Sequence, residues 1–478
     1  MAKFRNALAL AAALLATPAR FEQAFAAAPD AGPMPPDLVA FRALYKELVE
    51  INTTLSAGDC TKASYALRER LKAAGIPEAD LHVIVPPNLP KYGNLVARLR
   101  GSDPNSKAIL LVGHTDVVEA NPADWQSDPF KLIEENGVFY ARGSADDKAM
   151  VSVLADTLIR FKKEGFQHKR DLILGATCGE ETSAVFNGVK YLVDNHRNLI
   201  DAEFGINENG NGRMDRAGKR VMYSIQAGQK VAQNFKVEIT SAGGRASRPQ
   251  DGNIIYTMAE ALGRLNAYEF PAEIDEPVRR YFSAAADAEG GQLAQDLLAV
   301  VKTPADPAAV KRILDDRQYG PVLSTTCTTT LIEGGHAPNA LPQRVTANVN
   351  CRIKPGTAVE DVQKTLEHVF ANPDVKLTPV GEIAKSTAAP PLTREIMEPI
   401  QRVAAKMWPG VPVVPALVPG ADDSRFLTPA GIPTYGISGQ FRSFDGDGTH
   451  ALNERIPAQV LYESRAFLYD LIKIYANQ

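Results

Sequence analysis

The stretch AILLVGHTDVV, residues 108–118, is an apolar run that ends abruptly in a polar turn. Such runs are typical of strands whose two faces are both buried, as in a sheet covered by helices on each side. Strand-like segments of the same kind follow at DLILGATCGEE (171–181) and AEFGI (202–206), and helix-like runs separate them after Asp147 and at GVKYLVDNH (188–196). This strand–helix alternation predicts an α/β sheet.

The sequence pattern changes near Val231. The following segments read as a two-faced strand, a helix, paired strands and a second helix, an order typical of a small α+β sandwich. Residues 271–320, which are polar and rich in Ala and Asp, are predicted to add helices to this insert. We therefore predict a main domain in two parts, 36–230 and 378–478, with an inserted domain at 231–377.

The N-terminus predicts a secretory signal peptide over residues 1–26. Lys3 and Arg5 precede an unbroken apolar run from Ala7 to Ala16, and the small-residue site Ala24-Phe25-Ala26 follows. An ordinary first helix or a lone membrane anchor is the alternative, but ten apolar residues are too few to span a bilayer. We therefore expect a secreted or periplasmic protein that does not stay on a membrane once the signal is cleaved.

Charge and cysteine content narrow the expected partners and bonds. The 478 residues carry a formal net charge of −4 without long charge runs, so neither nucleic acid nor an anionic membrane is expected as a partner. Export permits disulfides, but four cysteines do not make a disulfide framework in a chain of this length. Cys327 and Cys351 are the favoured pair, because they lie on two strand-like runs joined by a Gly/Pro-rich connection.

Titratable side chains follow the strand-like runs. The clusters are GHTD (His114, Asp116), SADDKA (Asp146, Asp147), CGEET (Glu180, Glu181) and NENGNG (Glu208), and DGDGTHALNE near the C-terminus adds His450. Each cluster alone is typical of a surface turn or a solvated helix face. Three of them, however, directly follow an apolar run, and open α/β sheets bind ligands where their strands end. Imidazole nitrogens and carboxylate oxygens are the donors expected for zinc, or less often manganese or cobalt.

These motifs resemble those of a known family, the M20 co-catalytic dizinc metallopeptidases, which include aminoacylase-1, carboxypeptidase S, glutamate carboxypeptidase, succinyl-diaminopimelate desuccinylase and carnosinase-type dipeptidases. The resemblance runs from about residue 40 to the end and is carried by GHTDVV, ARGSADDKA, CGEETS, NENG, GGHAPNALP and GTHALNE. It implies an α/β catalytic domain of the zinc-dependent exopeptidase type with an inserted α+β lid, which is often a dimerisation surface. The main domain is then the catalytic domain, and residues 231–377 are the lid.

The resemblance implies two zinc ions per subunit, with cobalt or manganese as substitutes. One ion is held by His114, Asp146 and Glu208. The other is held by Asp146, Glu181 and His450, so that Asp146 bridges the two. A carboxylate that faces two divalent cations offsets charge that the other ligands leave. Negative charge is therefore favourable in the SADDKA turn, where family members hold the peptide bond after the bridging aspartate in the cis form.

Three further carboxylates receive roles from the resemblance. Glu180 is the general base, which takes a proton from the metal-activated water and later delivers it to the departing amine. Asp116 accepts the second ring N–H of His114 and so fixes its tautomer. Asp147 helps to orient the turn that carries the bridging ligand.

The lid departs from the family pattern at Arg245. Family members usually carry a histidine in a GG-H-x-S-x-P setting, which often reaches the partner subunit's site to stabilise the oxyanion, whereas this chain reads SAGGRASRPQ. Arg245 is either a surface arginine or a guanidinium that replaces the imidazole as a clamp for the oxyanion or a carboxylate. Arg352, in NCRIKPG, and Arg425, in GADDSRFL, match family arginines that would bind the substrate carboxylate, with Asn339 as a lid contact.

The predicted function is hydrolysis of an amide bond in a small peptide or an N-acyl-amino acid, with a homodimer through the lid as the expected assembly. A non-catalytic member that only binds metal or peptide is the alternative. Glu180 argues against it, since a binding protein needs no general base, whereas Arg245 argues for it. A metallo-aminopeptidase of an unrelated dizinc family would explain the ligand types, but not the lid or the GG-x-x-x-N-x-x-P pattern in GGHAPNALP.

Overall fold

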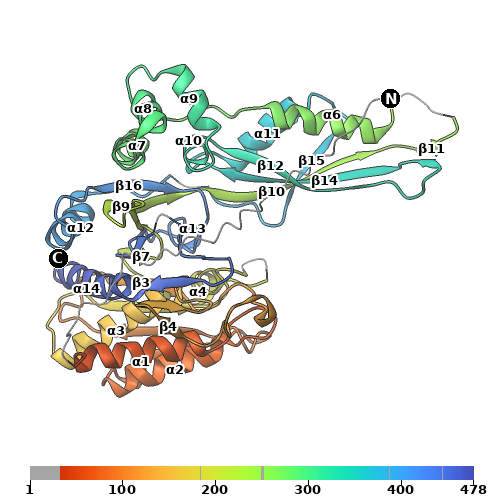
Figure 1. Ribbon diagram of the computed structural model, residues 1–478. Coiled ribbons are helices and arrows are strands. Elements are labelled where there is room, and N and C mark those ends of the chain that lie inside the picture. The colour runs from red at the N-terminus through yellow and green to blue at the C-terminus, as the bar shows by residue number, and fades with distance from the viewer. Residues whose placement is uncertain (1–32, 183–184, 249–251, 387, 444) are drawn as a thin grey trace, which may run out of the picture.

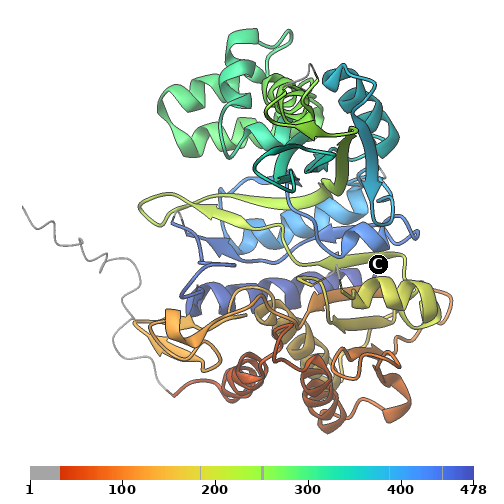
Figure 2. The same cartoon turned by 90° about the vertical axis from the view of Figure 1, so that its right-hand side faces the viewer.

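The computed structural model of the chain describes residues 33–182, 185–248, 252–386, 388–443 and 445–478. The predicted signal peptide, residues 1–26, lies outside these residues. The described chain forms a helix-covered sheet in the lower part of Figure 1 and a smaller sheet with its own helices above it. Figure 2 shows the same stacking after a quarter turn. Within the described ranges, no helix combines the length and the apolar character that crossing a bilayer requires.

The main sheet has ten strands in the order β1-β2-β6-β3-β7-β17-β9-β8-β18, and β16 pairs with β9 beside this path. The strands are β1 (Leu81–Ile84), β2 (Asn94–Leu99), β3 (Ile109–His114), β6 (Leu172–Thr177), β7 (Phe204–Asn207), β8 (Gly212–Met214), β9 (Arg220–Gln229), β16 (Val413–Val418), β17 (Thr434–Gly436) and β18 (Phe441–Arg442). β3 runs parallel to β6 and β7, and β17 runs parallel to β7. The carboxyl ends of these four strands therefore lie along one edge.

Helices cover both faces of the main sheet. On one side lie α1 (Pro36–Glu50), α2 (Cys60–Ala73), α3 (Lys148–Glu164), α12 (Arg394–Met407) and α14 (Ala458–Tyr475), and on the other α4 (Gly188–Asn195), α5 (Arg197–Ile200) and α13 (Ser424–Leu427). Along β3, Ile109 and Leu111 belong to the first apolar core, whereas Leu110 and Val112 belong to the second. Successive strand residues point to opposite faces, so β3 is buried on both. The α/β sheet predicted from residues 108–118 is confirmed.

A small three-stranded sheet and two 3-10 helices complete the main domain. A three-stranded sheet consists of β4 (Ile133–Glu135), β5 (Val138–Tyr140) and β19 (Arg455–Pro457), in the order β19-β5-β4. Two 3-10 turns, η1 (Glu78–Asp80) and η2 (Pro122–Asp124), lie in the connections.

The smaller sheet is antiparallel, in the order β12-β14-β10-β15. Its elements are β10 (Val231–Thr240), α6 (Ile254–Ala267), β12 (Thr326–Gly334), β14 (Arg344–Ile353), α11 (Val359–Phe370) and β15 (Lys376–Val380). Phe235, Val237 and Ile239 alternate along β10 and pack in a core of their own with α6 and α11. At the far end of this sheet, β11 (Gly244–Arg245) pairs with β13 (Ala340–Leu341). This is the inserted α+β unit, and we call it the lid.

The segment 271–320 is helical, as predicted, and contains α7 (Glu276–Glu289), α8 (Gly291–Val300) and α9 (Pro307–Leu314), followed by α10 (Gly320–Leu323). Its apolar core takes in Met222 of β9 and Val414 of β16. These helices therefore pack against the end of the main sheet rather than within the lid sandwich. In Figure 1 they lie at the upper left, above β9 and β16.

All four cysteines are paired. The predicted bond between Cys327 and Cys351 is confirmed, and it joins register neighbours on β12 and β14. A second bond, which the sequence did not predict, joins Cys60 at the start of α2 to Cys178 just after β6.

Candidate metal centre

Five predicted ligands converge at the carboxyl edge of the main sheet. His114 is the last residue of β3, Glu208 directly follows β7, and Glu181 lies in the loop after β6. Asp146 belongs to the turn before α3, and His450 belongs to the loop before β19. Because β3, β6 and β7 are parallel neighbours, the side chains that follow them are brought together.

The ligand atoms form two sets that share one aspartate. The Nε2 atom of His114 lies 3.1 Å from Asp146 Oδ1 and 3.6 Å from Glu208 Oε2. On the other side, His450 Nε2 lies 2.8 Å from Glu181 Oε1 and 3.5 Å from Asp146 Oδ2. Each oxygen of Asp146 therefore faces a different histidine, which is the arrangement of a bridging carboxylate. The Asp146–Asp147 peptide bond is cis, as the resemblance implies.

Asp147 lies close enough to His114 and Glu208 to complete an alternative group of three ligands. Its Oδ2 atom, however, accepts a hydrogen bond from the backbone N–H of His114 at 3.2 Å. Asp147 therefore holds the end of β3 against the start of α3, which agrees with the orienting role expected for it.

The donor set and its electrostatics fit divalent cations. Burial raises the pKa of Glu208 to about 7, and the neighbouring carboxylates of Asp146 and Asp422 act in the same direction. Hydrogen bonds to Asp146 and Glu181 raise the pKa of His450 to about 10. Both shifts show that the pocket favours positive charge. Two imidazoles and three carboxylates supply nitrogen and oxygen donors of the kind that zinc binds.

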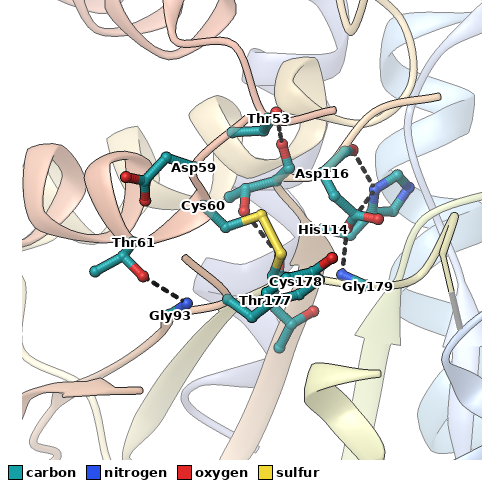
Figure 3. The surroundings of a disulfide bond; sticks show 12 residues. Thr53, Asp59, Cys60, Thr61, Gly93, His114, Asp116, Thr177, Cys178 and Gly179 are labelled. Carbon is teal, nitrogen blue, oxygen red and sulfur yellow. Dashed lines mark hydrogen bonds and ion pairs between the residues drawn. A yellow bond between two sulfur atoms is a disulfide. The ribbon is translucent and has the colours of Figure 1, made fainter. Parts of the chain in front are cut away.

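Asp116 organises the loop after β6, as Figure 3 shows. Its carboxylate accepts hydrogen bonds from the backbone N–H groups of Gly179 at 2.7 Å, Glu180 at 3.2 Å and Glu181 at 3.1 Å. The ring atom Nδ1 of His114 lies 3.0 Å from the backbone oxygen of Asp116 and 3.6 Å from its carboxylate. The expected contact to His114 is thus made by the main chain of Asp116, because the carboxylate is already used by three amides.

Glu180 lies beside Arg425, which is in turn close enough to Arg352 for their charges to interact. Its carboxylate is nearly buried, and Arg425 Nη2 is 3.9 Å from Oε1. Burial, reinforced by the charge of Glu208, raises the pKa of Glu180 well above its usual range. In the described part of the chain, the Nε and Nη2 atoms of Arg425 are buried without a hydrogen-bond partner. Burial and the charge of Arg425 lower the pKa of Arg352, so the two guanidinium groups repel each other.

The model of peptidase family M20/M25/M40 matches residues 110–474, the segment that contains every one of these groups. The chain belongs to this family. N-fatty-acyl-amino acid synthase/hydrolase PM20D1 of Xenopus tropicalis is 24% identical over 385 residues, which cover 79% of this chain and 74% of that relative. Carboxypeptidase S of Saccharomyces cerevisiae is 26% identical over 283 residues, which cover 56% of this chain and 49% of that relative.

Solved structures share the fold. The M20 family metallo-carboxypeptidase Sso-CP2 of Sulfolobus solfataricus superimposes with a TM-score of 0.66 at 17% identity, over 93% of this chain and all of that one. Human carnosine dipeptidase 1 gives a TM-score of 0.62 at 16% identity, over 91% of this chain and 96% of that one. This M20 peptidase is therefore a metal-dependent enzyme of the amide-hydrolysing type, with the catalytic domain and lid of its family.

The structure does not bring Arg245 and Asn339 to the metal centre. Both are exposed at the tip of the lid, where Arg245 pairs with Ala340 and the backbone oxygen of Asn339 accepts a hydrogen bond from Ala246. Figure 1 shows β11 at the right-hand end of the lid sheet. Among the residues described, neither contacts any of the five ligands. The two residues therefore lie together, but apart from the site that they were predicted to serve.

Sequence reasoning missed Glu454, which is fully buried behind the bridging ligand. Its Oε1 atom accepts hydrogen bonds from the backbone N–H groups of Ala145 at 2.7 Å and Asp146 at 2.9 Å. Its Oε2 atom accepts from Arg142 Nη1 at 2.6 Å and from the N–H of Gly143 at 3.1 Å. Glu454 thus holds the turn of Asp146 to the loop of His450. The only signal was its place at the end of the GTHALNE motif.

Two aspartates of the GADDSRFL segment were also missed. Asp423 accepts a hydrogen bond at 2.6 Å from Asn187 Nδ2, which also donates to the backbone oxygen of Gly179. Asp422 accepts hydrogen bonds from the side chains of Asn209 and Gln229. They connect the helix of Arg425 to the loops that carry the predicted metal ligands and Glu180.

Proposed function

We propose that this M20 peptidase hydrolyses the amide bond of a small peptide or an N-acyl-amino acid whose free carboxylate binds to Arg352 and Arg425. The observation that carries the proposal is the neighbouring pair of guanidinium groups of Arg425 and Arg352. Arg425 lies 3.9 Å from Glu180, and within the described ranges its Nε and Nη2 atoms are buried without a hydrogen-bond partner. Burying a charged donor without a partner is unfavourable. A carboxylate in the substrate would satisfy it with charge-assisted hydrogen bonds.

The proposed site holds two zinc ions, one on His114, Asp146 and Glu208 and the other on Asp146, Glu181 and His450; cobalt or manganese could replace them. Bound zinc would polarise the scissile carbonyl group and lower the pKa of a water molecule. The arrangement of the ligands as two sets that share Asp146 supports this assignment.

Glu180 is the proposed general base. It is adjacent in sequence to a metal ligand, its carboxylate is nearly buried, and its raised pKa suits a group that accepts a proton near neutral pH. After taking a proton from the attacking water, it would deliver that proton to the departing amine. This placement argues against the alternative of a non-catalytic binding member, which would have no use for a base in that position.

The relatives support the same substrate class. The name of PM20D1 gives N-fatty-acyl-amino acids as the compounds on which it acts, and the name of carboxypeptidase S implies cleavage at a free C-terminus. Both kinds of substrate carry a free carboxylate next to the amide to be cleaved. We extend this chemistry to the present chain. The length of the acyl group and the side chain of the amino acid are left to the assay described below.

A homodimer through the lid is part of the proposal. β12 is an edge strand, and its residues Leu331 and Ile332 are 64% and 60% exposed; on α6 nearby, Tyr256 is 68% exposed. Exposed apolar side chains along an edge strand favour pairing with another chain. In such a dimer Arg245 would reach the partner subunit's site. The two disulfides support the further proposal that the enzyme is secreted or periplasmic.

A substrate panel tests the function. Purified enzyme with added zinc is assayed on dipeptides, N-acetyl-amino acids and long-chain N-acyl-amino acids, each beside its C-terminal amide as the matched control. We expect free acids to be cleaved at least about a hundredfold faster than their amides, because the amides lack the charge that the arginines bind. Glu180→Gln should lower kcat at least about a hundredfold while the bound metal is retained. Equal rates on acids and amides would contradict the carboxylate site, and normal turnover in Glu180→Gln would contradict the base.

A further inference from the structure

We propose that the Cys60–Cys178 disulfide is a positioning element of the active site, which fixes the loop carrying Glu180 and Glu181 to helix α2 and is required for full activity. The inference rests on the proposed function, since it concerns the same hydrolytic site. Its experiment includes a measurement that does not depend on turnover.

The Cys60–Cys178 disulfide is attached directly before the loop that carries Glu180 and Glu181. Cys178 directly follows β6 and is buried, and its Cα atom lies 6.0 Å from that of Cys60. Gly179, Glu180 and Glu181 come next. A covalent link to another part of the fold therefore lies two residues before the general base and three before a metal ligand. Figure 3 shows the disulfide with Gly179, Asp116 and His114 close by.

Any shift of this loop would reach both metal sets. Its three amides bind the Asp116 carboxylate, and the backbone oxygen of Asp116 lies 3.0 Å from His114 Nδ1. Glu181 contacts His450 on the other side. The loop therefore lies between the two histidines, and its position affects how both sets of ligands are spaced.

Glu180 depends on the main chain for its placement. Its carboxylate accepts no hydrogen bond from any residue that the structure describes, and Arg425 lies 3.9 Å away. The loop also has a narrow path, because Gly179 has φ +96° and a Cβ atom there would lie 2.3 Å from the backbone oxygen of Phe186. The general base is thus positioned mainly by the backbone that the disulfide anchors, since its side chain has only the 3.9 Å contact with Arg425 to fix it.

The other end of the bond is a rigid anchor. The N–H of Thr61 donates to the backbone oxygen of Lys91, and the hydroxyl of Ser64 donates to that of Gly93. Further along α2, Leu67 is fully buried in the main core. An anchor held by hydrogen bonds and by packing limits the motion of whatever is covalently bound to it.

The lid disulfide provides a matched comparison within the same chain. Cys327 and Cys351 are direct partners on β12 and β14, which are already joined by the backbone hydrogen bonds of the sheet. Neither cysteine lies beside Glu180 or a predicted metal ligand in sequence, although Cys351 precedes Arg352 of the proposed carboxylate site. Loss of this bond should leave the geometry of the metal centre unchanged, so its removal controls for the general effect of losing a disulfide.

Formation of the Cys60–Cys178 bond removes two electrons and two protons from the two thiols. A phosphine reductant reverses this: the sulfurs take up two electrons and two protons, and the phosphine becomes its oxide with oxygen from water. The proposal predicts that turnover follows the oxidation state of this pair.

The experiment compares Cys60→Ser/Cys178→Ser with Cys327→Ser/Cys351→Ser and the unmodified enzyme at fixed zinc. We expect the first double variant to lose about tenfold to a hundredfold in kcat with little change in KM, because the displaced groups act on the reacting atoms. Its zinc affinity, measured by chelator competition without substrate, should fall at least about tenfold, since Glu181 is a ligand. The lid variant should match the unmodified enzyme in kcat and in zinc affinity, and a change confined to KM would reflect Arg352, the neighbour of Cys351.

A reductive titration supplies the second arm. The activity of Cys327→Ser/Cys351→Ser should fall in step with the appearance of two thiols per chain as phosphine is added, whereas the activity of Cys60→Ser/Cys178→Ser should not respond. This arm decides the question even if Cys60→Ser/Cys178→Ser does not fold. A lower melting temperature with unchanged kcat and zinc affinity would overturn the proposal, because the bond would then serve only stability. If no substrate were cleaved by any form, the proposed function would fail, and the zinc affinities would still test the positioning role.

Discussion

The metal centre and the lid tip differ in how far one chain completes them. His114 is 2% exposed, ends a fully buried strand, and lies within 3.6 Å of two other predicted ligands. Arg245 is exposed on a two-residue strand and contacts none of the ligands in the described ranges. The difference teaches that the proposed metal site is complete within one catalytic domain, whereas Arg245 would need another surface, such as that of a partner subunit, to act on a substrate. The following predictions test that division.

The largest effects are expected inside the catalytic domain. His114→Ala and His450→Ala should each lose about one of two zinc equivalents and at least about a hundredfold in kcat, since each histidine serves one metal set. Elemental analysis of the purified variants measures the metal. His450 is 56% exposed, so its variant should keep the melting temperature of the unmodified protein, whereas removal of the buried His114 ring should lower it. Full metal occupancy in both variants would remove these histidines from the site.

A smaller effect is expected at the lid tip. If Arg245 stabilises the oxyanion, Arg245→Ala should lower kcat and kcat/KM together by about tenfold to a hundredfold, because the contact exists only in the transition state. If Arg245 only holds a substrate carboxylate, KM should rise while kcat stays nearly constant. Steady-state kinetics separates the two cases. Arg245→His is the companion variant, since a site built for the family histidine would tolerate it.

A variant that cannot dimerise is the control for the Arg245 prediction. Leu331→Glu/Ile332→Glu places charges on the exposed edge of β12 and should yield a monomer by light scattering. If Arg245 acts in the partner subunit, this monomer should show the same kinetic loss as Arg245→Ala, and adding Arg245→Ala to it should lose nothing more. An active monomer that still depends on Arg245 would place the arginine in its own chain's site. Unchanged kinetics in every variant would leave it as a surface residue.

The smallest effect concerns stability where the two domains join. Lys230 lies between β9 and β10, is fully buried, and donates a hydrogen bond to the backbone oxygen of Ser324. Burial lowers its pKa to about 7. Between that value and the ordinary lysine pKa the unfolded chain binds one more proton, so stability rises with pH across this window and is independent of this residue below it.

Lys230→Met should therefore reduce the slope of unfolding free energy against pH between about pH 7 and pH 10 by up to about 1.4 kcal/mol per unit. Denaturant titrations at several pH values measure this slope. Lys236, a partly exposed lysine on β10, provides the control: Lys236→Met should leave the slope unchanged. An identical slope in Lys230→Met would show that the buried lysine keeps its proton through a partner in the folded state.

Local sequence pattern explains why much of the fold, and the convergence of several candidate ligands, could be predicted; their assignment to two metal sets came from the family resemblance. The apolar run at residues 108–118 has to be buried on both faces, and that requirement places His114 at the end of a central strand. Glu208 follows from the same argument at the end of β7. The inserted unit was visible because Val231 begins a strand of alternating burial, unlike the strands before it.

Contacts between distant segments could not be predicted in the same way. The partner of Cys60 is 118 residues away, and nothing in either local sequence specifies it. The segment 271–320 was recognisable as helical, but the surface on which it packs depends on Met222 of β9 and Val414 of β16, which are distant in sequence and become buried beneath it. The carboxylate of Asp116 was expected to bind an imidazole and instead binds three amides, because loop geometry decides which donors reach it.

The buried carboxylate of Glu454 has a consequence for the biosynthesis of the enzyme. The turn that presents Asp146 is held by a side chain made 308 residues later, and His450 is supplied by the same late segment. A ribosome therefore completes most of the chain before the second metal set exists. A chain that ended between Arg442 and His450 would contain the strands of the main sheet and the lid, yet would lack His450 and Glu454, and with them one predicted ligand and the support of Asp146. Under the proposed assignment, synthesis of these late residues would be required before the chain could hydrolyse a substrate.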